Sequence, residues 1–199
     1  MPHIDYYFAT ISPFTYLAGM KLEEIAGNHG ATIAYKPLDI MSLFAKTGGV
    51  PPKDRHPNRQ AYRLQELERK AKLAGLPLNM KPMFWPTNPA PSSFAIIAAQ
   101  NAGGGNLAAL VHAFTRACWA EDRNVAEDDV IRACLEGAGF DPTLADSGML
   151  EGADTYARNL EEAVGRGAFG APFYMTVTDQ RVCGHVRLED LDAVLSGKI

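Results

Sequence analysis

The stretch between Asp5 and Ala18 limits the possible folds most, because an extended segment passes there directly into a helix. Residues 3–8 are rich in aromatic and branched side chains, and Ile4, Tyr6 and Phe8 fall on one face of an extended chain. This composition and alternation predict a β-strand with one buried face. The chain is therefore expected to begin with a strand that leads straight into a helix.

Ser12 and Pro13 stand at the junction between these two elements. A serine hydroxyl can cap a helix by accepting a hydrogen bond from an amide of the first turn, and proline suits the first helical position. The apolar pattern that follows predicts one helix running toward Ile25 and ending near Gly30. A hydroxyl beside the unpaired amides of a helix start predicts a small anion site. The alternative is that Ser12 serves only as a cap.

The other end of the chain predicts a second group of strands. Residues 170–177 form an apolar run that Pro172 opens, residues 179–180 are turn residues, and residues 181–183 predict a short return strand. Residues 188–195 then predict a closing helix. A strand, helix and strand at the start, followed by a proline-led strand, a hairpin and a last helix, are typical of a thioredoxin-like fold.

That fold places a Cys-Pro-x-Cys pair at the start of the first helix, whereas this chain has Ser12-Pro13-Phe14-Thr15. Dithiol exchange needs one thiolate that attacks and a second thiol that resolves the mixed disulfide. Hydroxyl groups occupy both sulfur positions here. The sequence therefore excludes a disulfide oxidoreductase mechanism at this position and leaves the predicted anion site.

The middle of the chain predicts helices. Residues 31–36 alternate well enough for a second strand, and residues 41–46 predict a short helix. From Pro57 to about Gly167 the pattern is helical throughout. We therefore predict an α/β protein with an all-helical domain inserted between the second and third strands of a thioredoxin-like fold. The predicted boundaries are 1–38 and 168–199 for the thioredoxin-like domain and 39–167 for the insertion.

Composition restricts the function. The chain has 199 residues, of which 47% are hydrophobic, and a formal net charge of −4. That balance argues against a nucleic-acid or anionic-membrane binder. No basic region followed by an apolar core begins the chain, so a cytoplasmic location is expected. Three cysteines at unrelated spacings are expected to be buried free thiols, and no pair of Cys or His residues has the spacing of a metal site.

Other features that could bind a ligand lie in the helical part. The aromatic loop Phe84-Trp85-Pro86-Thr87-Asn88 could cover a planar ligand or could plug the space between the two domains. A basic run could hold a carboxylate or could simply be solvated; its members are Lys53, Arg55, His56 and Arg59. His112 lies on an apolar helix and is expected to be a packing residue rather than a base.

Five segments together carry a family resemblance: residues 12–18, 119–121, 161–172, 169–173 and 184–188. With the helical insertion, they resemble the 2-hydroxychromene-2-carboxylate isomerases. This family is related to the kappa-class glutathione transferases within the DsbA-like thioredoxin superfamily. The resemblance covers essentially the full length of the chain.

The resemblance implies a glutathione site. Ser12 would hydrogen-bond the glutathione sulfur and favour the thiolate, and Pro172 would be cis. The backbone of Ala171 would pair with the extended tripeptide. The implied cofactor-binding positions are Ser12, Gly49, Val50, Arg59, Ala171, Pro172, Val186 and Arg187. The expected substrate-binding positions are Phe14, Trp85 and Asn88.

Several of these positions depart from the family pattern. Gly49 stands where an asparagine is usual, Arg59 where a lysine is expected, and Val186 where an acidic residue precedes the family arginine. Ala9 replaces an aspartate that is common at the end of the first strand. These changes predict an altered site rather than a standard one.

The implied reaction converts 2-hydroxychromene-2-carboxylate to trans-o-hydroxybenzylidenepyruvate by thiolate addition, bond rotation and elimination, with glutathione regenerated as a cofactor. The implied partners are a small aromatic substrate and a second copy of the chain in a homodimer. Two alternatives stay open: a kappa-like glutathione transferase that acts on another electrophile, and a non-catalytic thioredoxin-like binding protein.

Overall fold

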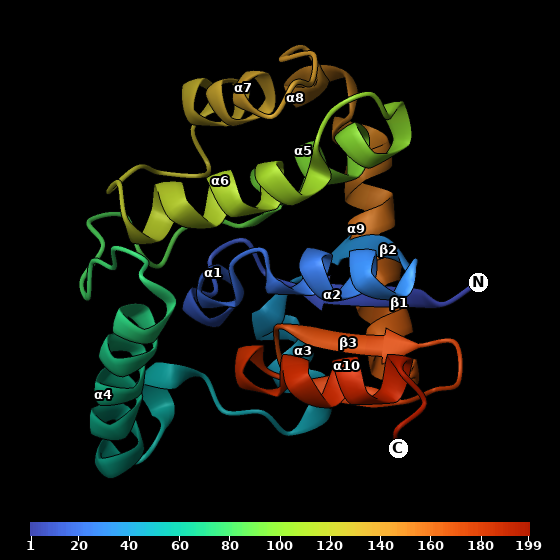
Figure 1. Ribbon diagram of the computed structural model, residues 1–199. Helices are drawn as coiled ribbons and strands as arrows, with labels where there is room; N and C mark the ends of the chain where they lie inside the picture. Colours follow the sequence, from blue (N-terminus) through green and yellow to red (C-terminus); the bar gives the residue numbers. More distant parts are fainter.

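A four-stranded sheet organises the computed structural model, which describes all 199 residues (Figure 1). Its strands are β1 (His3–Phe8), β2 (Thr32–Pro37), β3 (Phe173–Thr176) and β4 (Arg181–Cys183), in the order β2-β1-β3-β4. β1 and β2 are parallel, whereas β3 runs antiparallel to β1, and β4 antiparallel to β3. The α/β class and the thioredoxin-like arrangement predicted from the sequence are confirmed.

Every element between β2 and β3 is helical, as predicted. The α-helices are α1 (Pro13–Ala18), α2 (Lys21–His29), α3 (Ile40–Thr47), α4 (Pro57–Ala74), α5 (Ala90–Ala102), α6 (Leu107–Trp119), α7 (Asp128–Gly137), α8 (Leu144–Ser147), α9 (Met149–Gly165) and α10 (Leu188–Leu195). Short 3-10 helices form at η1 (Pro52–Asp54) and η2 (His185–Arg187). None of the helices combines the length and the apolar character needed to cross a bilayer.

The first helix is shorter than predicted. The sequence pattern predicts one helix from Pro13 toward Ile25, but the structure divides it into α1 and α2 at Gly19. Gly19 has a φ of +57°, a left-handed value that glycine adopts without a steric penalty, and its N–H donates to the carbonyl of Tyr16. The apolar periodicity continues across this break, which is why the pattern alone does not reveal it.

The two faces of the sheet pack into separate cores. Ile4, Tyr6 and Phe8 lie on the predicted common face and join the larger core, together with residues of α2, α10 and the inserted helices. Tyr7, on the opposite face, joins a smaller core with residues of α3 and the end of α9. The thioredoxin-like core thus takes in helices from the range 39–167 as well. The domain boundaries 1–38, 39–167 and 168–199 stay a prediction.

The inserted helices also protect the outer edge of the sheet. The Gln100 side chain on α5 accepts a hydrogen bond from the N–H of Tyr35 at 2.8 Å and donates one to its carbonyl at 3.1 Å. One side-chain amide therefore satisfies the N–H and the carbonyl of Tyr35 on the edge strand β2. Unpaired backbone groups of an edge strand could otherwise pair with another chain.

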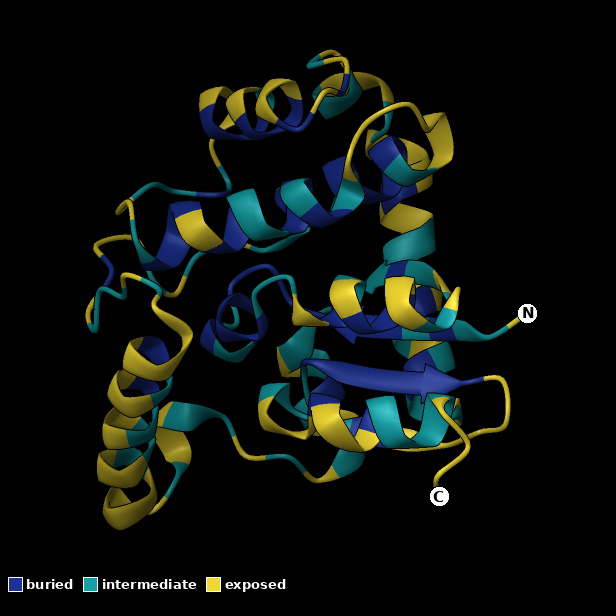
Figure 2. Cartoon of the chain, in the orientation of Figure 1, coloured by how far each residue is buried: buried dark blue, intermediate teal, exposed yellow.

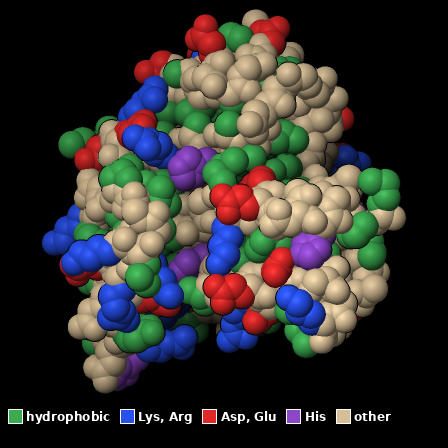
Figure 3. All heavy atoms as spheres, viewed as in Figure 1, with side chains coloured by type: hydrophobic (Ala, Val, Ile, Leu, Met, Phe, Trp, Pro, Cys, Tyr) green, Lys and Arg blue, Asp and Glu red, His purple; other side chains and the backbone are tan.

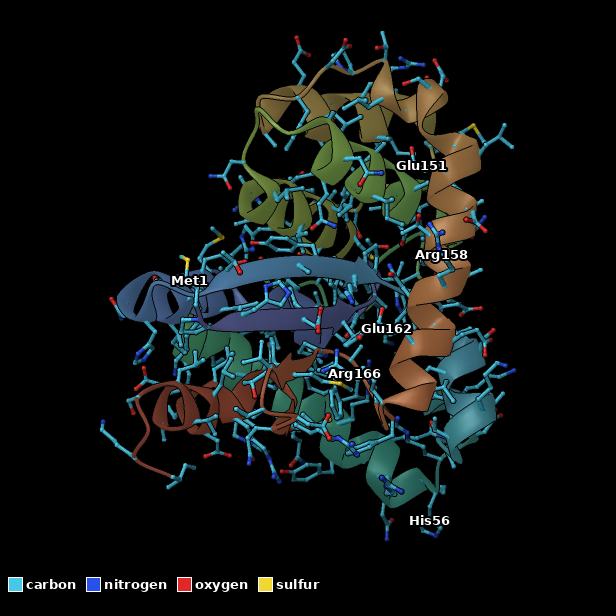
Figure 4. The ribbon with its side chains drawn as sticks, turned by 90° about the vertical axis from the view of Figure 1, so that its right-hand side faces the viewer. Met1, His56, Glu151, Arg158, Glu162 and Arg166 are labelled. Atoms are coloured by element: carbon cyan, nitrogen blue, oxygen red, sulfur yellow. The ribbon has the colours of Figure 1, made fainter.

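A charged cluster ties α9 to the strands. Lys36 Nζ on β2 lies 2.9 Å from Asp5 Oδ1 and 2.6 Å from Glu162 Oε1, and Arg166 contacts the other oxygen of Asp5. Tyr7 donates a hydrogen bond to Glu162 at 2.8 Å. Figure 4 shows Glu162 and Arg166 at the end of α9 that lies against the strands. We call these five residues the α9 clamp.

Helix α4 lies at the edge of the molecule (Figure 1). Of its 18 residues only Leu67 and Ala71 are buried, and most of its surface is exposed (Figure 2). α4 contacts α1 and therefore lies beside the residues that follow Ser12.

Candidate functional site

The backbone before Ser12 is fixed by two tryptophans. Trp85 Nε1 and Trp119 Nε1 each donate a hydrogen bond of 3.1 Å to the carbonyl of Ile11. The Ser12 N–H donates to the carbonyl of Ala9 at 3.0 Å. The aromatic loop therefore anchors the turn that carries Ser12, and Trp85 is partly buried in doing so.

Ser12 is the N-cap of α1, as predicted. Its Oγ accepts a hydrogen bond of 3.3 Å from the Thr15 N–H, so its own hydroxyl proton stays available to a ligand. The N–H of Phe14 has no acceptor within the chain, and Pro13 has no N–H. A hydroxyl proton and an unpaired amide therefore lie within one turn, and both can donate to an anion.

The predicted cis bond between Ala171 and Pro172 is confirmed. The Pro172 carbonyl accepts a hydrogen bond of 2.9 Å from Gly184, whereas neither the N–H nor the carbonyl of Ala171 bonds to another backbone group. Both groups of Ala171 are thus free to pair with an extended peptide, in the manner of an added strand.

His185 connects this loop to α1. Its ring stacks on the ring of Phe14, with centroids 5.1 Å apart and planes 17° apart. Its Nε2 is buried and has no hydrogen-bond partner. Burial, with a smaller contribution from the Lys70 charge, lowers the pKa of His185 to about 4, so the imidazole is neutral near pH 7.

A hollow of about 370 Å³ lies beside Phe14, along α4. It is lined by Phe14, Arg55, Asn58, Arg59, Tyr62, Arg63 and Glu66. Three arginines against one acid, Glu66, predict an anionic ligand. Figure 3 shows that Lys and Arg side chains gather over the region of α4.

Four residues of this hollow, Asn58, Tyr62, Arg63 and Glu66, were not predicted from the sequence, and Arg63 is the cation among them. Its guanidinium carbon lies 5.7 Å from the ring centre of Phe14 and 5.9 Å from that of Trp85. Burial, followed by the neighbouring Arg55 charge, lowers its pKa. Its position four residues after Arg59 places both on one face of a helix, and this spacing could have indicated it. His185 had no comparable signal.

The remaining cofactor positions lie in loops. Gly49 packs so closely against Phe44 that a Cβ at this position would clash with the ring of Phe44. The Val50 carbonyl accepts a hydrogen bond of 2.8 Å from Arg55, which connects this loop to the hollow. Val186 and Arg187 are exposed in η2.

Other predicted residues have structural contacts. Asn88 is exposed, and its side-chain oxygen accepts the N–H of Ala90 at the start of α5. His56 caps α4 in the same way by accepting the Asn58 N–H. His112 stacks on Tyr16 with ring centres 5.5 Å apart, as expected of a packing residue. The three cysteines are free, with Cys118 and Cys134 buried and Cys183 partly so.

The fold agrees with comparisons to known proteins. A family model for the DsbA-like thioredoxin domain matches residues 3–196, so the chain belongs to this family. It is 32% identical over 196 residues to a 2-hydroxychromene-2-carboxylate isomerase of Sphingobium xenophagum, covering 96% of this chain and 97% of that protein. A solved structure of such an isomerase matches with a TM-score of 0.77 and 26% identity, over 98% of this chain and 94% of the other.

Within the larger family, the chain therefore belongs to the 2-hydroxychromene-2-carboxylate isomerase family, and it is an isomerase. A shorter match, 33% identical over 85 residues, relates it to glutathione S-transferase kappa 1 of Caenorhabditis elegans; it covers 42% of this chain and 37% of that protein.

Proposed function

We propose that this chain is a glutathione-dependent isomerase of 2-hydroxychromene-2-carboxylate or a closely related aromatic acid. The observation that carries the proposal is the donor pair at the start of α1: the free hydroxyl proton of Ser12 and the unpaired N–H of Phe14. Relatives that are 25–32% identical bear the isomerase name, and a kappa-class transferase matches part of the chain.

Ser12 would hold the reactive sulfur. A hydroxyl that donates a hydrogen bond stabilises a thiolate more than a thiol, which lowers the thiol pKa and raises the thiolate fraction at neutral pH. Because its oxygen is already held by the Thr15 N–H, the hydroxyl is oriented before a ligand binds. When bound, glutathione supplies a nucleophilic thiolate that can add reversibly to a conjugated double bond.

The residues present fit a thiol tripeptide. The free N–H and carbonyl of Ala171 match the backbone groups of an extended peptide. Gly49 offers no side chain to such a ligand, and Val186 offers no charge, so Arg59 supplies the electrostatic attraction. A cytoplasmic homodimer that acts in the breakdown of aromatic compounds belongs to the same proposal.

The test is to measure glutathione binding by calorimetry, and conversion of 2-hydroxychromene-2-carboxylate by absorbance, for the parent protein and for Ser12→Ala. We expect glutathione-dependent turnover in the parent and a loss of roughly a hundredfold in kcat/KM in the variant, the magnitude typical of one oriented donor. Ser12→Gly is the matched control, because glycine caps helices nearly as well as serine but also lacks the hydroxyl. Equal losses in both variants would assign the effect to the hydroxyl.

Two other outcomes decide between the alternatives. Turnover of a chloronitrobenzene without turnover of the chromene would favour a kappa-like glutathione transferase. Absence of glutathione binding would favour a thioredoxin-like binding protein. Unchanged kcat/KM in Ser12→Ala would remove the role proposed for Ser12.

A further inference from the structure

Arg63 is partly buried and forms no ion pair or hydrogen bond within the chain; the nearby Glu66 charge only opposes the lowering of its pKa. Other arginines of the protein differ in this respect. Arg166 is bound to Asp5 in the α9 clamp, and Arg132 to Asp128 and Asp146. Withdrawing a guanidinium from water without a partner is unfavourable, so the protein maintains an unsatisfied cation at this place.

Two aromatic rings hold that cation in position. The guanidinium carbon of Arg63 lies 5.7 Å from the centre of Phe14 and 5.9 Å from the centre of Trp85, within the range of cation–π attraction. Trp85 is itself held by its hydrogen bond to Ile11, and Phe14 by its stacking on His185. The rings occupy space around the guanidinium but offer no in-plane acceptor, so its N–H groups can still form a bidentate pair with a planar anion.

The surroundings of Arg63 favour an anion over a zwitterion. Arg55 and Arg59 line the same hollow, and Glu66 is the acid among the lining residues. His185, which stacks on Phe14, is neutral near pH 7 and adds no charge. A hollow of about 370 Å³ is large enough for a one-ring aromatic acid.

The hollow is also close in the chain to the proposed thiol position. Phe14, against whose ring the Arg63 guanidinium lies, is separated from Ser12 by a single residue, Pro13. α4 and α1 are in contact, so a molecule in the hollow lies next to the start of α1.

We propose that Arg63 binds the carboxylate of the substrate and thereby fixes that carboxylate against α4. This inference rests on the proposed function and adds a specificity-determining residue to it. Trp85 and Phe14 then act by orienting Arg63. The more exposed arginines of the hollow contribute attraction without fixing the orientation of the carboxylate.

The test compares binding of trans-cinnamate with binding of cinnamamide, its neutral counterpart, by calorimetry in the absence of glutathione. We expect the parent protein to prefer cinnamate. Arg63→Gln should weaken cinnamate binding by about ten- to a hundredfold, the range for a lost hydrogen bond to a charged group, and leave cinnamamide binding unchanged. Arg63→Lys keeps the charge but not the planar guanidinium, so its affinity for cinnamate should lie between those of the parent protein and Arg63→Gln.

Arg69→Gln is the matched control. Arg69 lies on the same helix with its guanidinium 5.6 Å from the ring centre of Tyr62, but it is exposed and does not line the hollow. Arg69→Gln removes the same charge as Arg63→Gln, but from an exposed position outside the hollow. We therefore expect less than about a twofold change in the affinity for cinnamate. Circular dichroism melts of both variants would establish that each is folded.

Three results would overturn the proposal: no binding of millimolar cinnamate by the parent protein, no preference for cinnamate over the amide, or unchanged cinnamate binding in Arg63→Gln. The failure of the proposed function is distinguishable. A protein that shows no glutathione binding in calorimetry would still show the Arg63 dependence of cinnamate binding.

Discussion

Replacing Lys36 by Met should uncouple α9 from the sheet. The Lys36 ammonium lies between Asp5 and Glu162, at 2.9 and 2.6 Å, and methionine keeps most of the aliphatic stem while removing the charge. Two carboxylates would then share Arg166 as their positive partner in the α9 clamp. The change tests whether this cluster holds the thioredoxin-like core to the inserted helices.

The burial of the clamp sets the size of the effect. The side chains of Asp5 and Lys36 are 15% and 19% exposed, and that of Glu162 is 39% exposed. Breaking a fully buried pair costs about 3–5 kcal/mol, and an exposed pair contributes about 0–1 kcal/mol. Partial burial places the expected loss near 2 kcal/mol, which corresponds to a fall in Tm of about 4–8 °C for a chain of this size.

The loss should depend on pH. Burial raises the pKa of Asp5, but the hydrogen bonds and charges of Lys36 and Arg166 outweigh burial and lower the pKa overall. Burial also raises the pKa of Glu162, and the hydrogen bonds from Lys36 and Tyr7 lower it overall. A carboxyl group with a lowered folded-state pKa stabilises the fold above its unfolded pKa, about 4, and loses this contribution as the pH falls through its folded pKa. The difference between parent and variant should therefore be full at pH 7 and shrink toward pH 3.

Urea unfolding followed by circular dichroism at both pH values measures this difference. Lys72→Met is the control, because Lys72 pairs with Glu68 at 2.7 Å while the two side chains are 74% and 59% exposed. It should change the free energy of unfolding by less than about 0.5 kcal/mol. An effect of Lys36→Met no larger than this control, or equal at pH 7 and pH 3, would refute the reasoning.

Two further predictions concern the site. Trp85→Phe and Trp119→Phe should each lower the free energy of unfolding by about 1 kcal/mol, because the Ile11 carbonyl keeps one donor in each variant. The double variant leaves this carbonyl unsatisfied, so its loss should exceed the sum of the two by about 1–2 kcal/mol. Additive losses in thermal unfolding would contradict this prediction. The His185 imidazole should stay neutral from pH 8 to pH 5.5, because burial lowers its pKa to about 4. The unfolded chain takes up a proton at this histidine below about pH 6.5, so the free energy of unfolding should fall as the pH drops from there toward 4. A midpoint near 6.5 in an NMR titration would count against the burial of His185.

The sequence predicted the framework because that framework rests on local patterns. Alternation over residues 3–8 predicted β1, the cap and proline predicted the start of α1, and helical periodicity predicted most of the elements between β2 and β3. Gly19 escaped prediction because a single left-handed residue interrupts the helix without disturbing its apolar pattern. The cis bond before Pro172 was foreseen only through family resemblance.

The sequence by itself thus determined the strands, most of the helices, the donor at Ser12 and the absence of a dithiol. Only the tertiary structure decided which distant residues meet there. Trp85 and Trp119 converge on the Ile11 carbonyl, and Arg63 and His185 lie against Phe14. Local periodicity fixes the direction of a side chain on its own element. Its partners across the fold depend on how the elements pack, and in this protein that packing places Arg63 against Phe14 and Trp85, where we propose that it binds the substrate carboxylate.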